Sequence, residues 1–248
     1  MFILGFRPIF EKGLILKQHM LEALRDYPYD FVSAVFSGMG DGIIEGLEIS
    51  IPDENHFCIS EGIVKTKGKI YFITQKTLIK AERETNYVYL EIVSRQEADG
   101  TVYDTKIIQK KEEDLSLFEL FRYVRNAVMK DYGDIKEIFI DTANRVDRRK
   151  VLKSVLGGST LCGSYYRLFA QYLLRSGNSG MEDIAFAYQC LNGIHSIDMV
   201  KAYFKTEDTE NDKIISLMKD RIIKLESLME KVPAAKPERK QERKMIIS

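Results

Sequence analysis

The stretch GMGDGIIEGLEISIPDENHFCISEGIVKTKGKIYFI, residues 38–73, decides whether this chain begins with a phosphate-binding loop or with a sheet. A dinucleotide-binding loop needs G-x-G-x-x-G directly after a strand and at the start of a helix, because the helix N-terminus must face the pyrophosphate. Here Gly40 and Gly42 are followed by Glu45 where the third glycine would stand. The apolar residues after Gly42 move toward the alternation typical of a strand. The glycines are therefore predicted to shape turns in a β-meander.

The rest of the first half continues this strand pattern. Lys67-Gly68-Lys69 separates two apolar runs and predicts a tight hairpin, and Ala98-Asp99-Gly100 predicts a second hairpin between strands at 87–93 and 101–108. One short helix is expected at 17–25, ended by Pro28, with strand-like material from Phe31 to Gln109. Residues 1–110 are thus predicted to form an antiparallel β-sandwich-like domain.

The pattern changes after residue 110. Ser116 and Glu119 have capping-box spacing, and they precede a stripe at helical spacing that consists of Leu117, Leu120, Phe121, Val124 and Val128. Helices are also predicted at 165–174 and 181–191, with breaks at Gly157-Gly158 and at 176–180. Residues 111–233 are predicted to be a helical domain, which makes the fold class α+β.

The last predicted helix carries an apolar seam with steps of three and four residues: Ile215, Met218, Ile222, Leu225, Met229 and Val232. The seam is shorter than a confident coiled coil requires, so it fits either a helix inside its own bundle or a self-association surface. Residues 234–248 hold five Lys/Arg against two Glu and are predicted to be a disordered basic tail.

The composition limits the classes of function. Lys+Arg and Asp+Glu both number 37, so no net charge attracts nucleic acid or an anionic membrane. The three cysteines are far apart and have no C-x-x-C spacing, which fits a reducing compartment. Neither a signal peptide nor an apolar run long enough for a membrane span is recognised. A cytoplasmic protein is expected.

No motif for catalysis is present in the sequence. The histidines show no metal-binding spacing, Gly157-Gly158-Ser159-Thr160 lacks the lysine of a P-loop, and no G-x-S-x-G elbow occurs. We expect no enzyme activity, cofactor, metal or small-molecule substrate. The densest internal basic cluster consists of Arg145, Arg148, Arg149, Lys150 and Lys153. It has no aromatic residue among its members, so a solvated face is favoured over a nucleic-acid surface.

The N-terminal segment FEKGLILKQHMLEAL, residues 10–24, resembles the opening of the trimeric baseplate adaptor of type VI secretion systems, in which E-G, apolar positions and Q-H precede an aromatic residue. The matching positions are Gly13, Leu14, Leu16, Gln18 and His19, whereas Lys12 and Met20 depart from the pattern. Residues 40–73 also resemble the first strands of that adaptor's shell domain and of phage tail-fibre and receptor-binding proteins.

The resemblance implies a structural component of a contractile injection or phage-tail-like baseplate that joins the wedge to a distal module. It also implies that the five matching residues contact partner subunits and that the protein is a homotrimer. The alternatives are an ordinary N-terminal arm that packs on its own sheet, a regulatory module that binds an acidic protein or nucleic acid, and an enzyme whose site carries no linear motif.

Overall fold

The computed structural model describes residues 12–13, 15–98, 100–125, 130–139 and 145–230. Its helices are α1 (Gln18–Val35), the 3₁₀ helix η1 (Ile135–Phe139), α2 (Gly163–Arg175), α3 (Met181–Leu191), α4 (Ile197–Phe204) and α5 (Asn211–Glu230). Its strands are β1 (Gly42–Gly46), β2 (Ile49–Asp53), β3 (His56–Ile59), β4 (Gly62–Thr66), β5 (Lys69–Ile73), β6 (Thr77–Lys80), β7 (Glu84–Glu97), β8 (Gly100–Lys110), β9 (Phe118–Arg125), β10 (Val146–Asp147), β11 (Leu152–Val155) and β12 (Gly158–Leu161).

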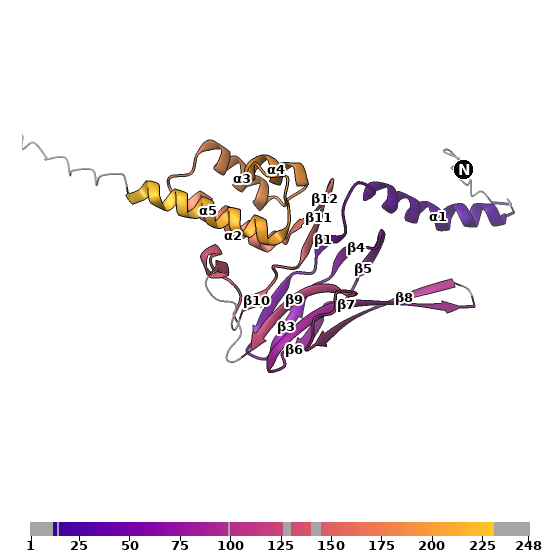
Figure 1. Ribbon diagram of the computed structural model, residues 1–248. Helices are drawn as coiled ribbons and strands as arrows, with labels where there is room; N and C mark the ends of the chain where they lie inside the picture. Colours follow the sequence, from indigo (N-terminus) through magenta and orange to yellow (C-terminus); the bar gives the residue numbers. More distant parts are fainter. Residues whose placement is uncertain (1–11, 14, 99, 126–129, 140–144, 231–248) are drawn as a thin grey trace, which may run out of the picture.

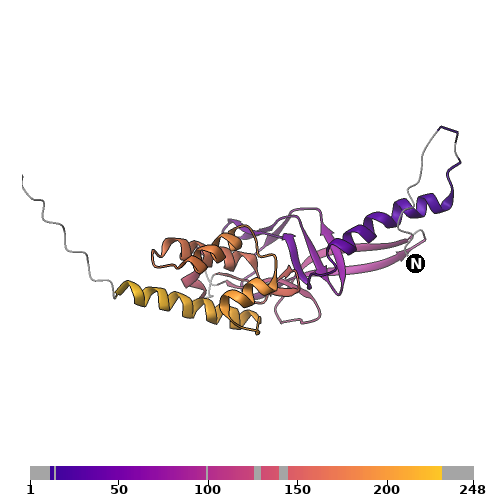
Figure 2. The same cartoon turned by 90° about the horizontal axis from the view of Figure 1, so that it is seen from above.

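The elements separate in space into a strand-rich body and a cluster of helices. In Figure 1, α2 to α5 gather on one side of the strands, while α1 extends away from the body on the opposite side. The hairpin of β7 and β8 projects in the same direction as α1, and Figure 2 shows the same arrangement from above. The molecule is therefore elongated, with a helix and a hairpin projecting at one end.

Three sheets make up the body. The strand orders are β12-β11-β1-β4-β5, β10-β9-β7-β8 and β2-β3-β6. Pairing is antiparallel between the described strands except for β1 and β11, which run parallel with Ile43 opposite Lys153. A parallel pair needs a long connection, and here the connection contains all the strands from β2 to β10.

Two apolar cores lie on the two sides of this parallel pair. The first is enclosed by the sheets and includes Phe57, Val64, Val88 and Phe121, each fully buried. The second lies among α2 to α5 and the hairpin of β11 and β12. Ile43 on β1 packs against both cores, so one side chain joins the strand-rich body to the helices.

Gly40, just before β1, permits the close approach that the parallel pair requires. A Cβ atom at this position would lie 2.3 Å from the backbone C and O atoms of Gly158. The Gly40 amide donates to the carbonyls of Gly158 at 2.9 Å and Val155 at 3.2 Å, and the Ser154 hydroxyl donates to the Gly40 carbonyl at 2.6 Å. The glycine therefore does not serve a local turn, because its neighbours come from a hairpin much later in the chain.

Several sequence predictions are confirmed. The fold class is α+β. The Lys67-Gly68 hairpin joins β4 to β5, with both residues at positive φ. Strands β7 and β8 pair along their length from Tyr87 opposite Lys110 to Glu97 opposite Gly100, and the predicted turn residue Asp99 lies outside the described residues. Helices α2 and α3 cover the predicted 165–174 and 181–191.

The helix predicted from Leu117 is wrong, since Phe118–Arg125 forms strand β9. Leu120, Phe121 and Tyr123 are buried in the sheet core, and β9 pairs with β7, placing Phe121 opposite Val88. Ser116 does not cap a helix; its amide and hydroxyl donate to the Asp114 carboxylate. Pairing with β7 decides the conformation here, because a segment rich in aromatic and β-branched residues fits a half-buried sheet.

Two further boundaries differ from the sequence prediction. Helix α1 continues through Pro28 to Val35, so Phe31 is helical. The helix predicted at 17–25 is half as long as the observed one. A proline removes one backbone hydrogen bond, and the turns on either side keep theirs. Gly157-Gly158 is not a break between helices, because Gly157 lies in the turn of the β11 and β12 hairpin and Gly158 is the first residue of β12. The division at residue 110 stays a prediction, although β9 to β12 follow it.

The cluster of helices is held by a buried ion pair as well as by its core. Asp183 at the start of α3 accepts from Arg221 Nε of α5 at 2.8 Å and from the Tyr203 hydroxyl of α4 at 2.6 Å. Burial raises the pKa of the Asp183 carboxyl, but the hydrogen bonds from Arg221, Tyr203 and the Gly180 amide outweigh it, so the pKa lies below its ordinary value. One carboxylate thus joins three helices.

We expect Gly40→Ala to lower the free energy of unfolding by about 1 to 3 kcal/mol, because the added methyl group overpacks a backbone contact. Gly100→Ala is the control, since a Cβ atom there meets nothing within 4 Å. Chemical denaturation of both variants measures the difference. Equal stability of the two variants would contradict the assignment of Gly40 to the contact with the later hairpin.

Candidate functional site

The most unusual surface of the described structure is the apolar face of α1. Five large side chains are about half exposed or more: Leu21 at 51%, Leu24 at 49%, Tyr27 at 71%, Phe31 at 58% and Val35 at 54%. Their spacing of three and four residues places them on one side of the helix. An amphipathic helix in a globular protein turns such a face toward a core, and here the face is open to solvent.

The opposite side of α1 is mainly polar, although the exposed Tyr29 also lies there, and the helix is amphipathic. Glu22, Arg25, Asp26 and Asp30 occupy positions that helical geometry places away from the apolar side chains. Arg25 Nε donates to Asp26 at 2.6 Å, and Tyr27 stacks on Phe31 with ring centroids 6.4 Å apart. The apolar side of α1, defined by Leu21, Leu24, Tyr27, Phe31 and Val35, is called the α1 face below.

Lys65 fixes the C-terminal end of α1 to the sheet. Its ammonium group donates to the carbonyl of Phe36 at 2.8 Å and to that of Met39 at 2.6 Å, and the residue is 8% exposed. The last carbonyls of a helix lack partners within the helix, and a cation at that end also interacts favourably with the helix dipole. A buried lysine on β4 therefore sets where α1 leaves the body (Figure 1).

The five residues predicted to contact partner subunits lie before or at the start of α1. Gly13 has a φ of +95°, Leu16 is exposed, and the Gln18 side chain donates to Glu22 at 2.8 Å. His19 is exposed in the first turn, and Leu14 lies outside the described residues. Their role in binding stays a prediction, and they lie next to the α1 face in the chain.

Sequence reasoning missed most of the α1 face. The spacing of Leu21, Leu24, Tyr27, Phe31 and Val35 is readable in the sequence as a helical stripe. Pro28 interrupts that stripe and predicts its end, so a strand is predicted for the residues after it. The apolar periodicity indicates one continuous helix, whereas the tendency of proline to end a helix predicts two different elements.

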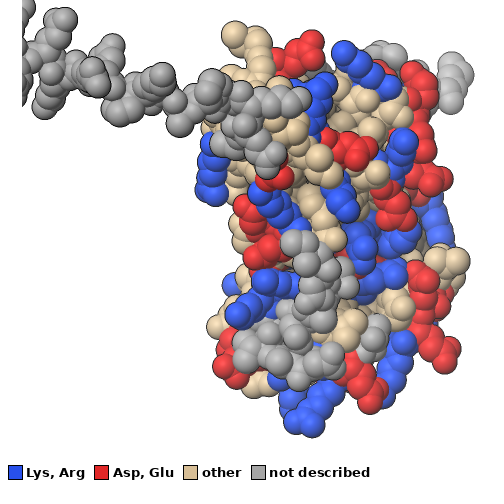
Figure 3. Space-filling model, turned by 60° about the vertical axis from the view of Figure 1, so that its left-hand side comes forward, with Lys and Arg blue, Asp and Glu red and all other residues tan. Residues whose placement is uncertain are grey.

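Four of the five members of the internal basic cluster are closely paired with a carboxylate, and Lys153 is the exception, with its nearest carboxylate 3.9 Å away. Each of the five members lies within 4 Å of a carboxylate: Arg145 of Glu137, Arg148 of Asp131, Arg149 of Asp147, Lys150 of Asp212 and Lys153 of Glu45. Figure 3 shows basic and acidic side chains interspersed on one face of the molecule. Phosphate binding by this cluster would have to displace these carboxylates, which disfavours a nucleic-acid surface here.

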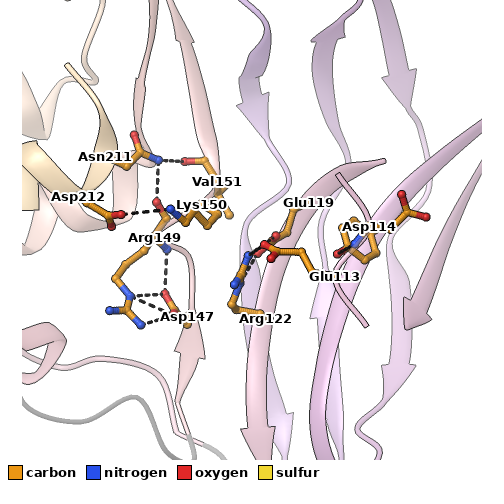
Figure 4. A network of polar contacts seen from close by, with 11 residues as sticks. Glu113, Asp114, Glu119, Arg122, Asp147, Arg149, Lys150, Val151, Asn211 and Asp212 are labelled. Carbon is orange, nitrogen blue, oxygen red and sulfur yellow. Dashed lines mark hydrogen bonds and ion pairs between the residues drawn. The ribbon is translucent and has the colours of Figure 1, made fainter. Parts of the chain in front are cut away.

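Part of this cluster has a structural task (Figure 4). Arg149 Nη2 donates to Asp147 at 2.7 Å, and Lys150 pairs with Asp212 at 3.1 Å. Asn211, the first residue of α5, donates from its amide to the carbonyl of Arg149 at 2.7 Å. These contacts attach the N-terminus of α5 to the segment before β11.

The seam of α5 faces the interior of the chain. Met218, Ile222 and Leu225 are almost fully buried in the core among the helices, and Ile215 packs against it. Met229 lies in the last turn, and Val232 is outside the described residues. Met218, Ile222 and Leu225 pack inside the chain's own bundle of helices, which is one of the two alternatives for the seam. Burial within the chain does not support their assignment to self-association.

The described residues offer no site for a metal and no helix for a membrane. Among them, no three His, Cys, Asp or Glu side chains are placed to hold a metal ion. None of the helices there is both long enough and apolar enough to cross a membrane. The three cysteines, Cys58, Cys162 and Cys190, are buried and free.

Comparison with known proteins gives two structural likenesses. No family model matches the chain, and no curated protein matches it. A chain of the type VI secretion system TssK-TssF-TssG baseplate subcomplex, seen by cryo-electron microscopy, is 9% identical with a TM-score of 0.40, over 88% of this chain and 99% of that one. The crystal structure of TssK is 10% identical with a TM-score of 0.29, over 94% of this chain and 58% of that one. These structural neighbours are baseplate proteins, and TM-scores this low do not establish a shared fold.

We expect Ile222→Glu to unfold the helices of the second part of the chain, because burying a carboxylate without a partner costs several kcal/mol. The neighbouring Ile223 is 53% exposed, and Ile223→Glu should leave stability nearly unchanged. Thermal unfolding followed by circular dichroism compares the two variants. A folded Ile222→Glu protein with a smaller assembly size would show instead that the seam packs between chains.

Proposed function

We propose that this protein is a cytoplasmic, non-enzymatic assembly component of a phage-tail-like or contractile injection baseplate, where it joins the wedge to a distal module. The α1 face is the observation that carries this proposal. A helix of 18 residues with five exposed apolar side chains on one side is suited to pack against another protein. The resemblance of residues 10–24 to the baseplate adaptor falls at the start of the same helix.

The way α1 is attached also supports a docking role. Lys65 holds its C-terminal end, and the helix projects from the body in the same direction as the β7 and β8 hairpin (Figures 1 and 2). A projecting helix can enter a groove of a partner subunit without rearrangement of the body. The five residues predicted as the partner interface, from Gly13 to His19, would then extend this contact toward the N-terminus.

We also propose that the protein is a homotrimer, in which the subunits do not contact one another through the α5 seam. The buried side of α5 is occupied by the chain's own core. Sedimentation of the purified protein at high micromolar concentration measures its assembly state, and we expect a trimer. A monomer under these conditions would remove the trimer and leave an adaptor that assembles only on its neighbours.

The docking proposal is tested with the double substitution Leu24→Ser and Phe31→Ser. We expect no loss of thermal stability, because both side chains are exposed, and a loss of partner affinity of at least about tenfold, because each side chain would be buried in the complex. The partners to test are the proteins encoded beside this gene, with any tail, sheath or wedge proteins first, co-expressed with the tagged protein and analysed by affinity purification and size-exclusion chromatography.

Leu115→Ser is the matched control, since Leu115 is 90% exposed on the loop between β8 and β9. This variant should bind its partners as the wild type does. Two outcomes count against the proposal: equal binding by the double variant, or no binding by any protein encoded beside the gene.

A further inference from the structure

A pocket lies where the end of α1, strands β1 and β11, and the start of α2 come together. Its volume is about 550 Å³. Apolar side chains of Phe36, Ile44 and Leu156 form part of its wall, and Lys153, Ser164 and Arg167 add polar groups. The pocket adjoins the α1 face, because Val35 in the last turn of α1 belongs to that face and also lines the pocket.

Lys153 places a poorly partnered ammonium group in this pocket. The side chain is 19% exposed, and its Nζ donates to the Ile44 carbonyl. The Glu45 carboxylate is 3.9 Å away, too far for a hydrogen bond. An ammonium group has three N–H donors, so a partly buried one with a single close acceptor is left with unused donors.

The charge balance of the pocket leaves room for an added anion. Glu45 and Glu48 are 82% and 61% exposed, so water screens their charges, and Glu48 is 3.4 Å from Arg167. Burial lowers the pKa of the Lys153 ammonium, and Glu45 and Glu48 oppose this shift without cancelling it. A desolvated cation that is not neutralised by its neighbours gains from a carboxylate placed beside it.

The first turn of α2 faces the same space. Its N-cap residue Cys162 makes no side-chain capping hydrogen bond, and the Ser164 hydroxyl lies 3.2 Å from the Cys162 thiol. The backbone amides at the start of a helix attract a negative group, and they add to the attraction of Lys153 and Arg167. Lys153 on β11 and Arg167 on α2, together with the start of α2, converge on one hollow.

We propose that this pocket binds the C-terminal residue of a partner polypeptide, with the terminal carboxylate at Lys153 and Arg167 and an apolar side chain against Phe36, Ile44 and Leu156. The wall contains both apolar and polar groups, which fits a peptide end with its apolar side chain and its polar backbone better than a plain alkyl chain. A C-terminus differs from internal residues by its free carboxylate, and the proposed site would recognise this group.

The probe is a labelled pool of short peptides with random sequences that end in Leu, Val, Ile or Phe, prepared as free acids and as C-terminal amides. Fluorescence anisotropy with the full chain compares the two pools. We expect the free acids to bind about tenfold more tightly or better, because the carboxylate gains charge-assisted hydrogen bonds. Lys153→Met should abolish this preference and leave the weaker amide binding in place.

Lys150→Met is the control, since Lys150 pairs with Asp212 outside the pocket and its loss should keep the preference for free acids. A second measurement uses the wild-type protein and does not depend on the folding of any variant. In it, NMR of the lysine side chains follows the pKa of Lys153, which should rise when a free-acid peptide is added and stay unchanged with the amide.

Equal binding of acids and amides, or no change in the pKa of Lys153, would overturn the proposal. Decanoate is the competing ligand: displacement of the peptides by decanoate at lower concentration than by any free-acid peptide would assign the pocket to alkyl carboxylates instead. The Leu24→Ser and Phe31→Ser variant should bind the free-acid peptides normally, so failure of the docking role of α1 and failure of this proposal are distinguishable.

Discussion

Ile43 on β1 pairs with Lys153 on β11, and this parallel contact connects the two cores of the protein. The Ile43 side chain packs against both cores, and Gly40 brings the backbone before β1 against the hairpin of β11 and β12. If this contact failed, the strand-rich body and the helices would lose the strand they share. The same contact places Lys153 beside the Ile44 carbonyl, so the pocket exists only because the two segments meet.

Charge in this protein serves mainly to hold elements together. Lys65 holds the end of α1, Asp183 joins α3, α4 and α5, and the contacts of Lys150 and Asn211 attach the start of α5. A chain with as many acidic as basic residues can pair most of its charges internally. The α1 face and the incompletely partnered Lys153 are the two features of the described residues on which the proposals rest. In those proposals both contact protein rather than nucleic acid.

The two surfaces would bind different parts of an assembly. The α1 face is convex and projecting, which suits insertion into a groove, whereas the pocket is concave and suits a chain end. They meet at the last turn of α1, where Val35 belongs to the α1 face and also lines the pocket. A subunit that joins two neighbours needs two separate contacts of this kind, each weak enough to form in order.

The sequence by itself determined the α+β class, the hairpins at Lys67-Gly68 and at residues 97–100, and the helices α2 and α3, because each depends on periodicity or turn chemistry within a short segment. Only the tertiary structure decided the rest. Leu120 and Phe121 fit a helix stripe equally well until β9 pairs with β7, which places Phe121 opposite Val88. The seam of α5 is equally apolar whether it packs inside or between chains. The neighbours of Gly40 and Lys153 lie far away in the chain, and a local pattern carries no information about which distant backbone will approach.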